Sequence, residues 1–330
     1  MTQALATCGE KEVIDVKVLV TGGAGFIGCN FVRYMLKQHP GIDITVLDKL
    51  TYAGRLENLE DVIKSIKFVK GDICDKDVVH ETMLGCDAVV NFAAESHVDR
   101  SIATPEDFVR TDVLGVFTLL EEARRSDVKR FVQISTDEVY GSTESGSFCE
   151  STLLDPSSPY SASKAGGELL ARSYVRTYGL NVMVTRSSNN YGPFQYPEKL
   201  IPVLVIKAMR NEPLPIYGKG TNVRDWLNVQ DNCRAIDVVL SKGKPGDIIN
   251  IGSGNEVPNI EIARRILKHM KRPESLIRFV ADRPGHDFRY SLNWDRMRQL
   301  GWKPEIDFDM GLKETVDWYV QNQSWWKPIV

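Results

Sequence analysis

Two groups of residues in this chain carry side chains suited to acid–base chemistry, and the first is Thr136, Asp137 and Glu138. They follow residues 130–134, an apolar run that predicts a buried strand. In a parallel sheet, ligands bind outside the carboxyl ends of the strands, so one hydroxyl and two carboxyls would meet a ligand there. When two carboxyl groups are neighbours, their pKa values separate, so one group can hold a proton while the other is charged. The same residue types also build turns and helix caps, so this stretch alone is equally compatible with a plain turn.

The second group is Tyr160 and Lys164, which lie four residues apart. Ser158 and Pro159 precede them and are typical of a helix start, so both side chains should share one helix face. An ammonium beside a phenol favours the phenolate, and we expect it to lower the pKa of Tyr160 from about 10 toward neutrality. Tyr160 would then serve as a general base. Taken alone, a Tyr–Lys pair at this spacing is more often an exposed surface pair.

A glycine-rich turn indicates which cofactor these groups work with. Gly22, Gly25 and Gly28 follow a predicted strand at residues 17–20 and open a predicted helix. The missing side chains let the backbone turn tightly and let a pyrophosphate approach the helix N-terminus. Asp48 ends the next predicted strand, 20 residues after Gly28. An acid there binds the ribose 2′-hydroxyl of NAD and repels the 2′-phosphate of NADP, so the sequence predicts NAD.

The alternation of apolar segments predicts the elements that position these groups. Strands are expected at residues 17–20, 42–47, 66–69, 88–92, 130–134 and 181–186, with helices between them, including 75–84, 107–125 and a segment that ends at 178. After residue 187 the pattern loosens. We expect a turn cluster at 189–193, short strands at 213–218, 222–226 and 247–251, and helices at 199–209, 229–240, 260–270 (with Asn259 as N-cap) and 308–321.

This order of elements predicts an α/β fold, a Rossmann-type doubly wound parallel sheet with a smaller, interleaved C-terminal substrate domain. We expect an N-terminal extension at residues 1–16. The NAD-binding domain should comprise residues 17–186 plus about 226–255, and the substrate domain residues 187–225 plus about 256–330.

Composition excludes several classes of function. The chain has 330 residues, 42% of them hydrophobic, and a net charge of −3, which gives no reason to expect a nucleic-acid partner. No apolar run is long enough to span a bilayer and no signal peptide is evident, so we expect a cytoplasmic protein without a membrane partner. The six cysteines and five histidines lack the spacing of a metal or disulfide site, and we predict no metal. His97, between Glu95 and Asp99, is better interpreted as part of a loop that orders the cofactor pocket than as a metal ligand.

Together these motifs resemble the extended short-chain dehydrogenase/reductase family that acts on nucleotide sugars, and within it the 4,6-dehydratases. The resemblance runs from about residue 17 to residue 304. It rests on long motifs at residues 93–102, 135–141, 158–168, 189–202, 213–226 and 282–287. It implies a nucleotide-sugar substrate carried by thymidine diphosphate, a tightly bound NAD that is regenerated in each turnover, and a homodimer in which the 107–125 helix is a candidate interface.

The resemblance also implies a role for each residue that matches a family motif. The expected cofactor contacts are Gly22, Gly25, Phe26, Ile27, Gly28, Asp48, Lys49, Asp72, Ile73, Ala93, Ala94, Thr111, Tyr160, Lys164 and Asn190. The expected substrate contacts are Ser96, Thr136, Asn189, Lys199, Pro215, Tyr217, Arg224, Asn259, Arg283 and His286.

The implied catalytic set is Thr136, Asp137, Glu138, Tyr160 and Lys164. Tyr160 would take the C4 hydroxyl proton while Thr136 binds the O4 oxygen. Glu138 would remove the C5 proton, and protonated Asp137 would assist loss of the C6 hydroxyl as water. Adjacent carboxyls suit these two tasks, since one must be neutral while the other is charged.

Three alternatives remain open. UDP-sugar 4-epimerases and decarboxylases of the same fold share the cofactor motifs and the Tyr160–Lys164 pair but do not need the acid pair. GDP-mannose 4,6-dehydratases usually have a serine in place of Asp137. A cofactor-binding protein without activity is disfavoured because every catalytic position is filled. The base is inferred from resemblance alone, because the thymine methyl is worth only roughly 1 kcal/mol in a pocket.

Overall fold

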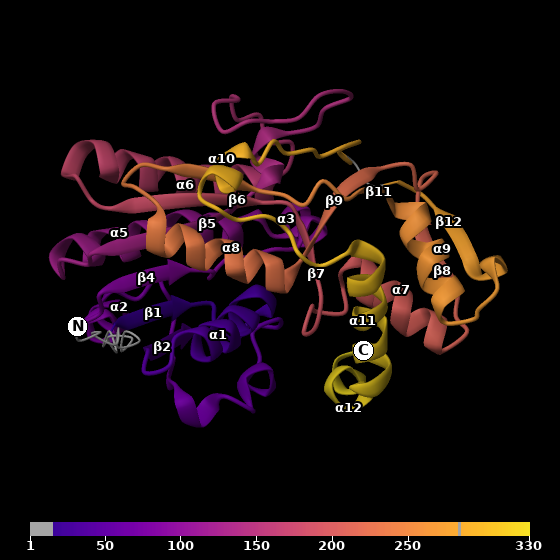
Figure 1. Ribbon diagram of the computed structural model, residues 1–330, viewed down its shortest axis with the longest axis horizontal. Helices are drawn as coiled ribbons and strands as arrows, with labels where there is room; N and C mark the ends of the chain where they lie inside the picture. Colours follow the sequence, from indigo (N-terminus) through magenta and orange to yellow (C-terminus); the bar gives the residue numbers. More distant parts are fainter. Residues whose placement is uncertain (1–15, 283–284) are drawn as a thin grey trace, which may run out of the picture.

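The structure, a computed structural model, describes residues 16–282 and 285–330, and its centre is a seven-stranded parallel sheet (Figure 1). The strand order is β10-β6-β5-β4-β1-β2-β3. The strands are β1 (Lys17–Thr21), β2 (Asp43–Asp48), β3 (Lys67–Lys70), β4 (Ala88–Asn91), β5 (Arg130–Thr136), β6 (Val182–Ser187) and β10 (Ile248–Ile251). The order reverses at β1, which lies between β2 and β4. This reversal leaves a crevice at the carboxyl ends of the strands, where ligands bind in such sheets.

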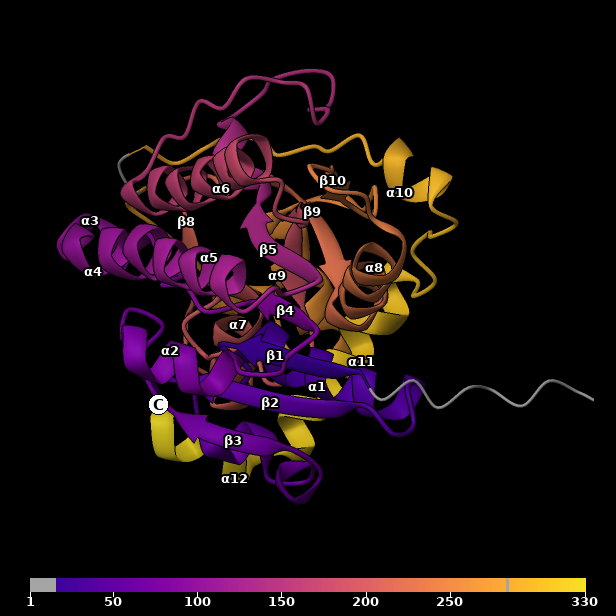
Figure 2. The same ribbon diagram turned by 90° about the vertical axis from the view of Figure 1, so that its left-hand side faces the viewer.

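Helices cover both faces of the sheet, as Figure 2 shows in a view turned from that of Figure 1. One face is covered by α1 (Phe26–Gln38) and α8 (Val229–Lys242), whose Phe31 and Ile236 are fully buried in a common core. The other face is covered by α2 (Lys76–Met83), α5 (Val116–Arg125) and α6 (Pro159–Tyr178). Because both faces are covered, the strands read as apolar runs rather than as alternating patterns. The predicted doubly wound α/β fold is confirmed.

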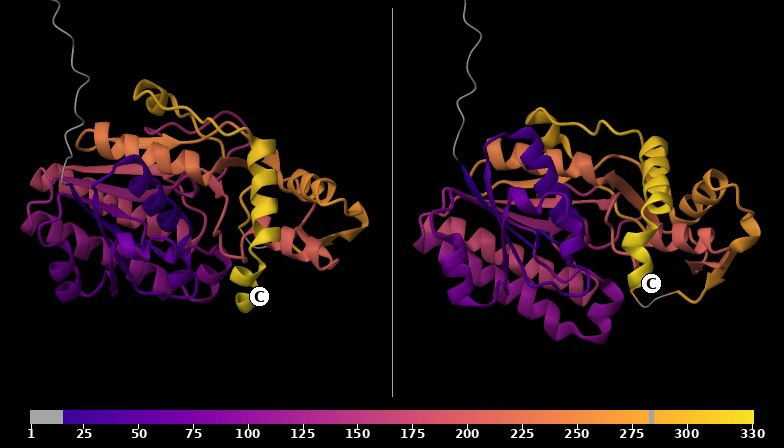
Figure 3. Two further views of the ribbon diagram at one scale, coloured as in Figure 1. Left: turned by 60° about the horizontal axis from the view of Figure 1, so that its bottom comes forward. Right: turned by 90° about the horizontal axis from the view of Figure 1, so that it is seen from below.

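A second core lies beyond the carboxyl ends of the sheet, built around Ile201, Leu204, Trp226 and Ile266. Its strands are β7 (Asn189–Tyr191), β9 (Val223–Asn228) and β11 (Glu256–Pro258) in one sheet and β8 (Leu214–Tyr217) and β12 (Ile277–Val280) in another. Its helices are α7 (Leu200–Met209), α9 (Asn259–His269), α11 (Phe308–Gln321) and α12 (Gln323–Trp326). In both views of Figure 3, α11 (yellow) lies between the large sheet and α7 and α9.

The domain boundaries stay a prediction, although the two cores follow them in large part. Met297 and Trp302, which lie in the segment expected with the substrate domain, pack into the first core instead. Met297 belongs to the short helix α10 (Asp295–Gln299), which packs against β10. In residues 16–282 and 285–330, no helix has the length and apolar character needed to cross a membrane.

Several local expectations are wrong. Residues 189–191 form β7 rather than a turn, because their backbone pairs with β9 while the side chains remain polar. The expected loop after β4 contains a short helix, α3 (Val98–Ala103). The expected single helix at 107–125 is α4 (Pro105–Val109), a π-helical turn (Arg110–Gly115) and α5. Asn259 is the first residue of α9, and Pro258 is its N-cap.

Candidate active site

One cavity at the carboxyl ends of the central strands brings together most of the predicted site residues. Its lining includes every predicted catalytic residue and every predicted cofactor contact. It also includes four of the predicted substrate contacts, Ser96, Thr136, Asn189 and Lys199. The cavity does not include Pro215, Tyr217, Arg224, Asn259 or His286 in its lining, and Arg283 lies outside the described residues.

The glycine turn between β1 and α1 forms the floor of this cavity. Gly22 has a φ of +67°, and a Cβ at Gly28 would collide with the Gly22 carbonyl oxygen. No described side chain caps the N-terminus of α1, and the first turn of this helix holds no acid. Its N–H groups and the positive end of its dipole are therefore suited to an anion such as a pyrophosphate.

Substituting Gly22 by alanine should sharply reduce the NAD content of the purified protein and lower the free energy of unfolding by about 2–3 kcal/mol. The new Cβ would lie 2.5 Å from the Ala93 backbone nitrogen, so β1 and β4 must separate at the cofactor edge. Gly85→Ala is the matched control, because Gly85 has a φ of +73° but a Cβ there would meet no atom within 4 Å. Equal losses in both variants, in urea unfolding and in bound NAD, would contradict a close-approach role for Gly22.

Asp48 is positioned for the ribose of an adenosine. It is 8% exposed, and its two carboxylate oxygens accept hydrogen bonds from the backbone nitrogens of Ala24 (2.9 Å) and Leu50 (2.8 Å). A carboxylate has further acceptor sites on each oxygen, which remain for ribose hydroxyls. The neighbouring Lys49 forms its ion pair with Asp72, with 2.8 Å between the ammonium and the carboxylate oxygen. These contacts leave the Asp48 carboxylate without a lysine partner among the described residues and fit the ribose of NAD.

The acid pair stands where β5 ends. Thr136 donates to Asp137 Oδ1 (3.3 Å) and accepts from the Glu138 backbone nitrogen (3.2 Å), which fixes the tight turn that follows the strand. Asp137 is 2% exposed, and its Oδ2 has no hydrogen-bond partner among the described residues. Burial raises the pKa of Asp137 well above its usual range, and the negative charges of Glu138 and Asp225 raise it further. These surroundings favour the protonated, neutral form of Asp137, and one of its oxygens is left for a ligand.

Tyr160 and Lys164 lie on the first turns of α6, as predicted. The helix begins with a capping box between Ser158 and Ser161. Burial raises the pKa of Tyr160 well above 10, with Glu138 and Asp112 adding to the effect, while burial lowers the pKa of Lys164. The expectation that Lys164 brings the phenol toward neutrality is therefore wrong for the chain by itself, because burial has the largest effect and the charges that act most strongly on the phenol, those of Glu138 and Asp112, are negative.

The contacts of this pair still place it in the site. The Lys164 ammonium donates to the Ile134 carbonyl oxygen at 2.7 Å, which fastens α6 to β5. The Thr136 hydroxyl acts on the Tyr160 phenol and lowers its pKa, so the two side chains lie close together. One threonine thus touches the phenol and the first acid, so all three can reach one substrate atom.

A buried carboxyl in the π-helical turn braces this arrangement. Asp112 accepts from Ser163 Oγ at 2.7 Å and from the Glu95 backbone nitrogen at 3.0 Å, which joins α6 to the loop after β4. Burial raises the pKa of Asp112 to about 6. The sequence offers no signal for this role, because an aspartate inside an amphipathic helix reads as a surface residue.

Substituting Asp112 by asparagine should remove a pH dependence of stability. The pKa of this carboxyl is about 6 in the folded state and near 4 when unfolded, so its contribution to stability is lost as the pH rises from 4 to 6. Relative to the parent protein, the variant should gain up to about 3 kcal/mol between pH 4 and pH 7 in urea unfolding. Asp295→Asn is the control. Hydrogen bonds from Asn293 and Arg298 lower the pKa of Asp295, and neither partner titrates between pH 4 and pH 7, so its difference from the parent should stay nearly flat over this range.

Arg186 connects the turn that carries the acid pair to helix α6, which carries Tyr160 and Lys164. It is 1% exposed, and it pairs through two nitrogens with Glu168, on α6 one turn after Lys164. A third nitrogen donates to the Tyr140 hydroxyl at 2.5 Å, at the end of the acid turn. The acid turn and the catalytic helix are thus held against one buried cation.

Arg186→Met should destabilise the protein by about 3–5 kcal/mol, because the substitution leaves the Glu168 carboxylate buried without its charge partner. The matched control is Arg264→Met, which breaks an exposed pair with Glu261 and should cost no more than about 1 kcal/mol. Urea unfolding measures both variants. Similar losses for the two variants would mean that the buried pair does not constrain the fold.

Of the remaining predicted substrate contacts, Tyr217, Arg224 and His286 lie at or beside residues 285–288. The Tyr217 and His286 rings meet edge to face with centroids 6.1 Å apart. Arg224 donates to the backbone oxygens of Val223, Asp287 and Phe288. The charge of Arg224 also lowers the pKa of Asp137, so this guanidinium acts electrostatically on the acid pair. The Asn259 Oδ1 atom is buried without a partner among the described residues. Their roles in substrate binding stay predictions.

Some residues of the cavity were not predicted. They include Thr51, Ala53, Gly54, Glu95, Ser135, Ser187, Ser188, Gln195, Tyr196 and Glu198. Gln195 and Glu198 lie inside the predicted motif at 189–202, so its density of polar residues was a usable signal. Ser135, Ser188 and Gln195 each have a buried side-chain oxygen without a partner in the described chain. Such atoms fit a polar ligand, because buried polar groups are normally paired.

The fold and this site define a nucleotide-sugar enzyme of the dinucleotide-binding type, and comparison with known proteins agrees. The family model described as GDP-mannose 4,6 dehydratase matches residues 19–315, and the chain belongs to this family. It is 50% identical to the dTDP-glucose 4,6-dehydratase of Streptomyces niveus over 95% of this chain and 96% of that protein.

Two further relatives are equally similar. The chain is 51% identical to the low-salt glycan biosynthesis protein Agl12 of Haloferax volcanii, over 93% of this chain and 99% of that protein. The structure matches that of DesIV, a dTDP-glucose 4,6-dehydratase from Streptomyces venezuelae solved with NAD and TYD bound. Here the TM-score is 0.94 and the identity 50%, over 96% of this chain and all of that one.

Proposed function

We propose that this protein is an NAD-dependent lyase that converts dTDP-glucose into dTDP-4-keto-6-deoxyglucose and water. The observation that carries the proposal is the pair formed by Asp137 and Glu138. Oxidation at C4 requires only the cofactor and the Tyr160–Thr136 pair, whereas removal of water requires a neutral acid beside a base. Burial raises the pKa of Asp137 and so favours its protonated form directly next to Glu138. The relatives named dTDP-glucose 4,6-dehydratase support the same substrate.

The cofactor fits the residues of the chain. Gly22 to Gly28 leave room for a pyrophosphate at the N-terminus of α1, and Asp48 stands at the ribose position. When bound in this cavity, NAD would supply an acceptor for the hydride of C4 and a donor of the same hydride to C6. The cofactor is therefore regenerated and has no need to leave. The positive charge of its oxidised ring also favours ionisation of a nearby phenol, which Lys164 alone does not achieve.

The side chains of the chain divide the proton transfers. Tyr160 removes the proton of the C4 hydroxyl, and Thr136, which lies close to the phenol, holds the O4 oxygen. The ketone at C4 acidifies the C5 proton, which the Glu138 carboxylate removes. Asp137 gives its proton to the C6 hydroxyl, which leaves as water. Glu138 then returns a proton to C5 when C6 is reduced.

A UDP-sugar 4-epimerase is the second candidate, because the fold and the Tyr160–Lys164 pair serve both reactions. The buried neutral acid argues against it, since epimerisation at C4 involves no leaving hydroxyl. The thymidine base, the homodimer and the cytoplasmic location remain parts of this proposal.

Incubation with dTDP-glucose tests the proposal. A 4-keto-6-deoxy sugar develops ultraviolet absorbance in alkali, and we expect this signal without added reductant. Competition between dTDP-glucose and UDP-glucose then measures the preference for the base, where one methyl predicts a ratio of roughly tenfold. Turnover of UDP-glucose alone would overturn the substrate assignment.

A further inference from the structure

Three side chains that have no role in the reaction described above meet at one edge of the cavity. This edge is called the mouth here, because the half-exposed Arg100 lies at it. Tyr52 follows β2, Arg100 lies in α3, and Glu198 lies between β7 and α7. The Tyr52 hydroxyl donates to Glu198 Oε1 at 2.8 Å. The Arg100 guanidinium lies 3.6 Å from the centroid of the Tyr52 ring, and its Nε is 3.4 Å from Glu198 Oε2. Each of the three side chains therefore contacts the other two.

The surroundings reinforce this cluster. The Tyr196 ring packs edge-on against Tyr52, with centroids 5.2 Å apart. Lys199, next to Glu198, donates to the Ser96 carbonyl oxygen at 2.5 Å. The Glu198 side chain is only 15% exposed, although Arg100 is about half exposed. A charge-assisted hydrogen bond and a cation–π contact at a partly buried carboxylate are stronger than the same contacts in open solvent.

The cluster joins two walls of the cofactor cavity. Thr51, Ala53 and Gly54, on either side of Tyr52, line the same cavity as Asp48. Tyr196 and Glu198 line it from the segment between β7 and α7. The hydrogen bond from Tyr52 to Glu198 therefore links two walls of the cavity. One wall is formed by residues 51–54, which follow Asp48, and the other by residues 196–198, which lead into the second core.

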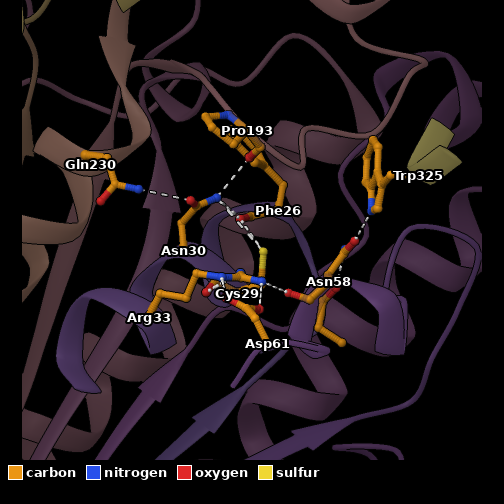
Figure 4. A network of polar contacts seen from close by, with 10 residues as sticks. Phe26, Cys29, Asn30, Arg33, Asn58, Asp61, Pro193, Gln230 and Trp325 are labelled. Atoms are coloured by element: carbon orange, nitrogen blue, oxygen red, sulfur yellow. Dashed lines mark hydrogen bonds and ion pairs between the residues drawn. The ribbon is translucent and has the colours of Figure 1, made fainter. Parts of the chain in front are cut away.

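Each wall also has hydrogen bonds that do not involve the cluster, and Figure 4 shows those made by Asn58 and Asn30. The Trp325 indole donates to Asn58 Oδ1 at 2.7 Å, and the Asn58 amide donates to the Ala24 carbonyl oxygen at 2.7 Å. The Asn30 amide donates to the Pro193 carbonyl oxygen at 3.0 Å, which fixes the opposite wall to α1. Because each wall has its own anchor, single substitutions in the cluster can open the mouth without detaching either wall.

We propose that Tyr52, Arg100 and Glu198 are positioning residues that retain the dinucleotide by tying the two cavity walls together at the mouth. They act through the walls and do not contact the reacting carbon atoms. The inference deepens the proposed function, because an enzyme that regenerates its cofactor gains from never releasing it. A dinucleotide under the tie cannot leave by this side until the contacts between Tyr52, Arg100 and Glu198 break.

Tyr52→Phe and Glu198→Gln test the proposal in the full-length holoprotein. The first keeps the ring under Arg100 and removes only the hydroxyl, and the second keeps the shape and removes the charge. Tyr174→Phe is the matched control, because it deletes a tyrosine–glutamate hydrogen bond of 2.7 Å to Glu121 on α5, and neither residue lines the cavity. The measurements are the NAD content after gel filtration, the rate of NAD loss into a trap, and kcat with and without added NAD.

Both cluster variants should lose NAD about tenfold faster than the parent, as expected for one charge-assisted hydrogen bond. Their kcat at saturating NAD should stay within about twofold of the parent, because the reacting groups are untouched. Unchanged retention in both variants would overturn the proposal, and so would a loss of kcat that added NAD does not restore. If a variant unfolds, Arg100→Gln, at a half-exposed residue, replaces it. Retention is measured without substrate, so its outcome is independent of the proposed reaction.

Discussion

Asp137→Asn should lower the rate of dehydration by about 10²–10⁴-fold, the usual contribution of a general acid. Asparagine keeps the shape of the side chain and can still accept from Thr136, which donates to Asp137 Oδ1 at 3.3 Å. It cannot give a proton to the leaving hydroxyl. C4 oxidation should survive, because that step depends on Tyr160 and Thr136.

Single-turnover absorbance separates the two steps. The Asp137→Asn variant should accumulate reduced cofactor after mixing with dTDP-glucose, since the 4-keto sugar forms but water is not lost. Glu138→Gln should block the following proton removal from C5 and accumulate the same species. Full dehydratase turnover in both variants would refute the assignment of the acid pair.

Tyr160→Phe should lower turnover by a similar factor, about 10²–10⁴-fold, and for a different reason. Without the phenol no side chain accepts the C4 hydroxyl proton, so oxidation itself stops. The surroundings of Tyr160 raise its pKa, which makes the cofactor charge necessary for its ionisation. Activity should therefore rise with pH as the phenol ionises in the holoenzyme.

The same absorbance assay distinguishes this variant from the previous ones. Tyr160→Phe should retain bound NAD yet show no reduced cofactor on mixing with substrate, whereas Asp137→Asn should show it. Tyr174→Phe again serves as the control for loss of a tyrosine hydroxyl and should behave like the parent. Accumulation of reduced cofactor in Tyr160→Phe would assign the first proton transfer to another group.

The cofactor half of the site could be predicted because its signals are local. Gly22 and Gly28 are needed where backbone atoms approach within van der Waals distance, and Asp48 must follow its strand directly. These requirements are set by the backbone, so they appear as fixed spacings in the sequence. The acid pair was visible for the same reason, since β5 delivers it to the sheet edge.

Other features depend on contacts that spacing does not encode. Asn189 and Asn190 form a strand because β9 lies beside them, and nothing in their own pattern indicates it. The pKa of Tyr160 depends on desolvation and on the negative charges of Glu138 and Asp112, which the spacing of Tyr160 and Lys164 does not indicate. Tyr52 and Glu198 are 146 residues apart, and only the folded chain brings the hydroxyl to the carboxylate.

The mass of the product formed from dTDP-glucose in deuterated water tests the proposed reaction most directly. We expect a product that has lost one water and gained one solvent deuterium at C5, where Glu138 exchanges the proton, with no net reduction of NAD. A product of unchanged mass, as an epimerase would form, or a dehydrated product without deuterium at C5, would contradict the proposed reaction.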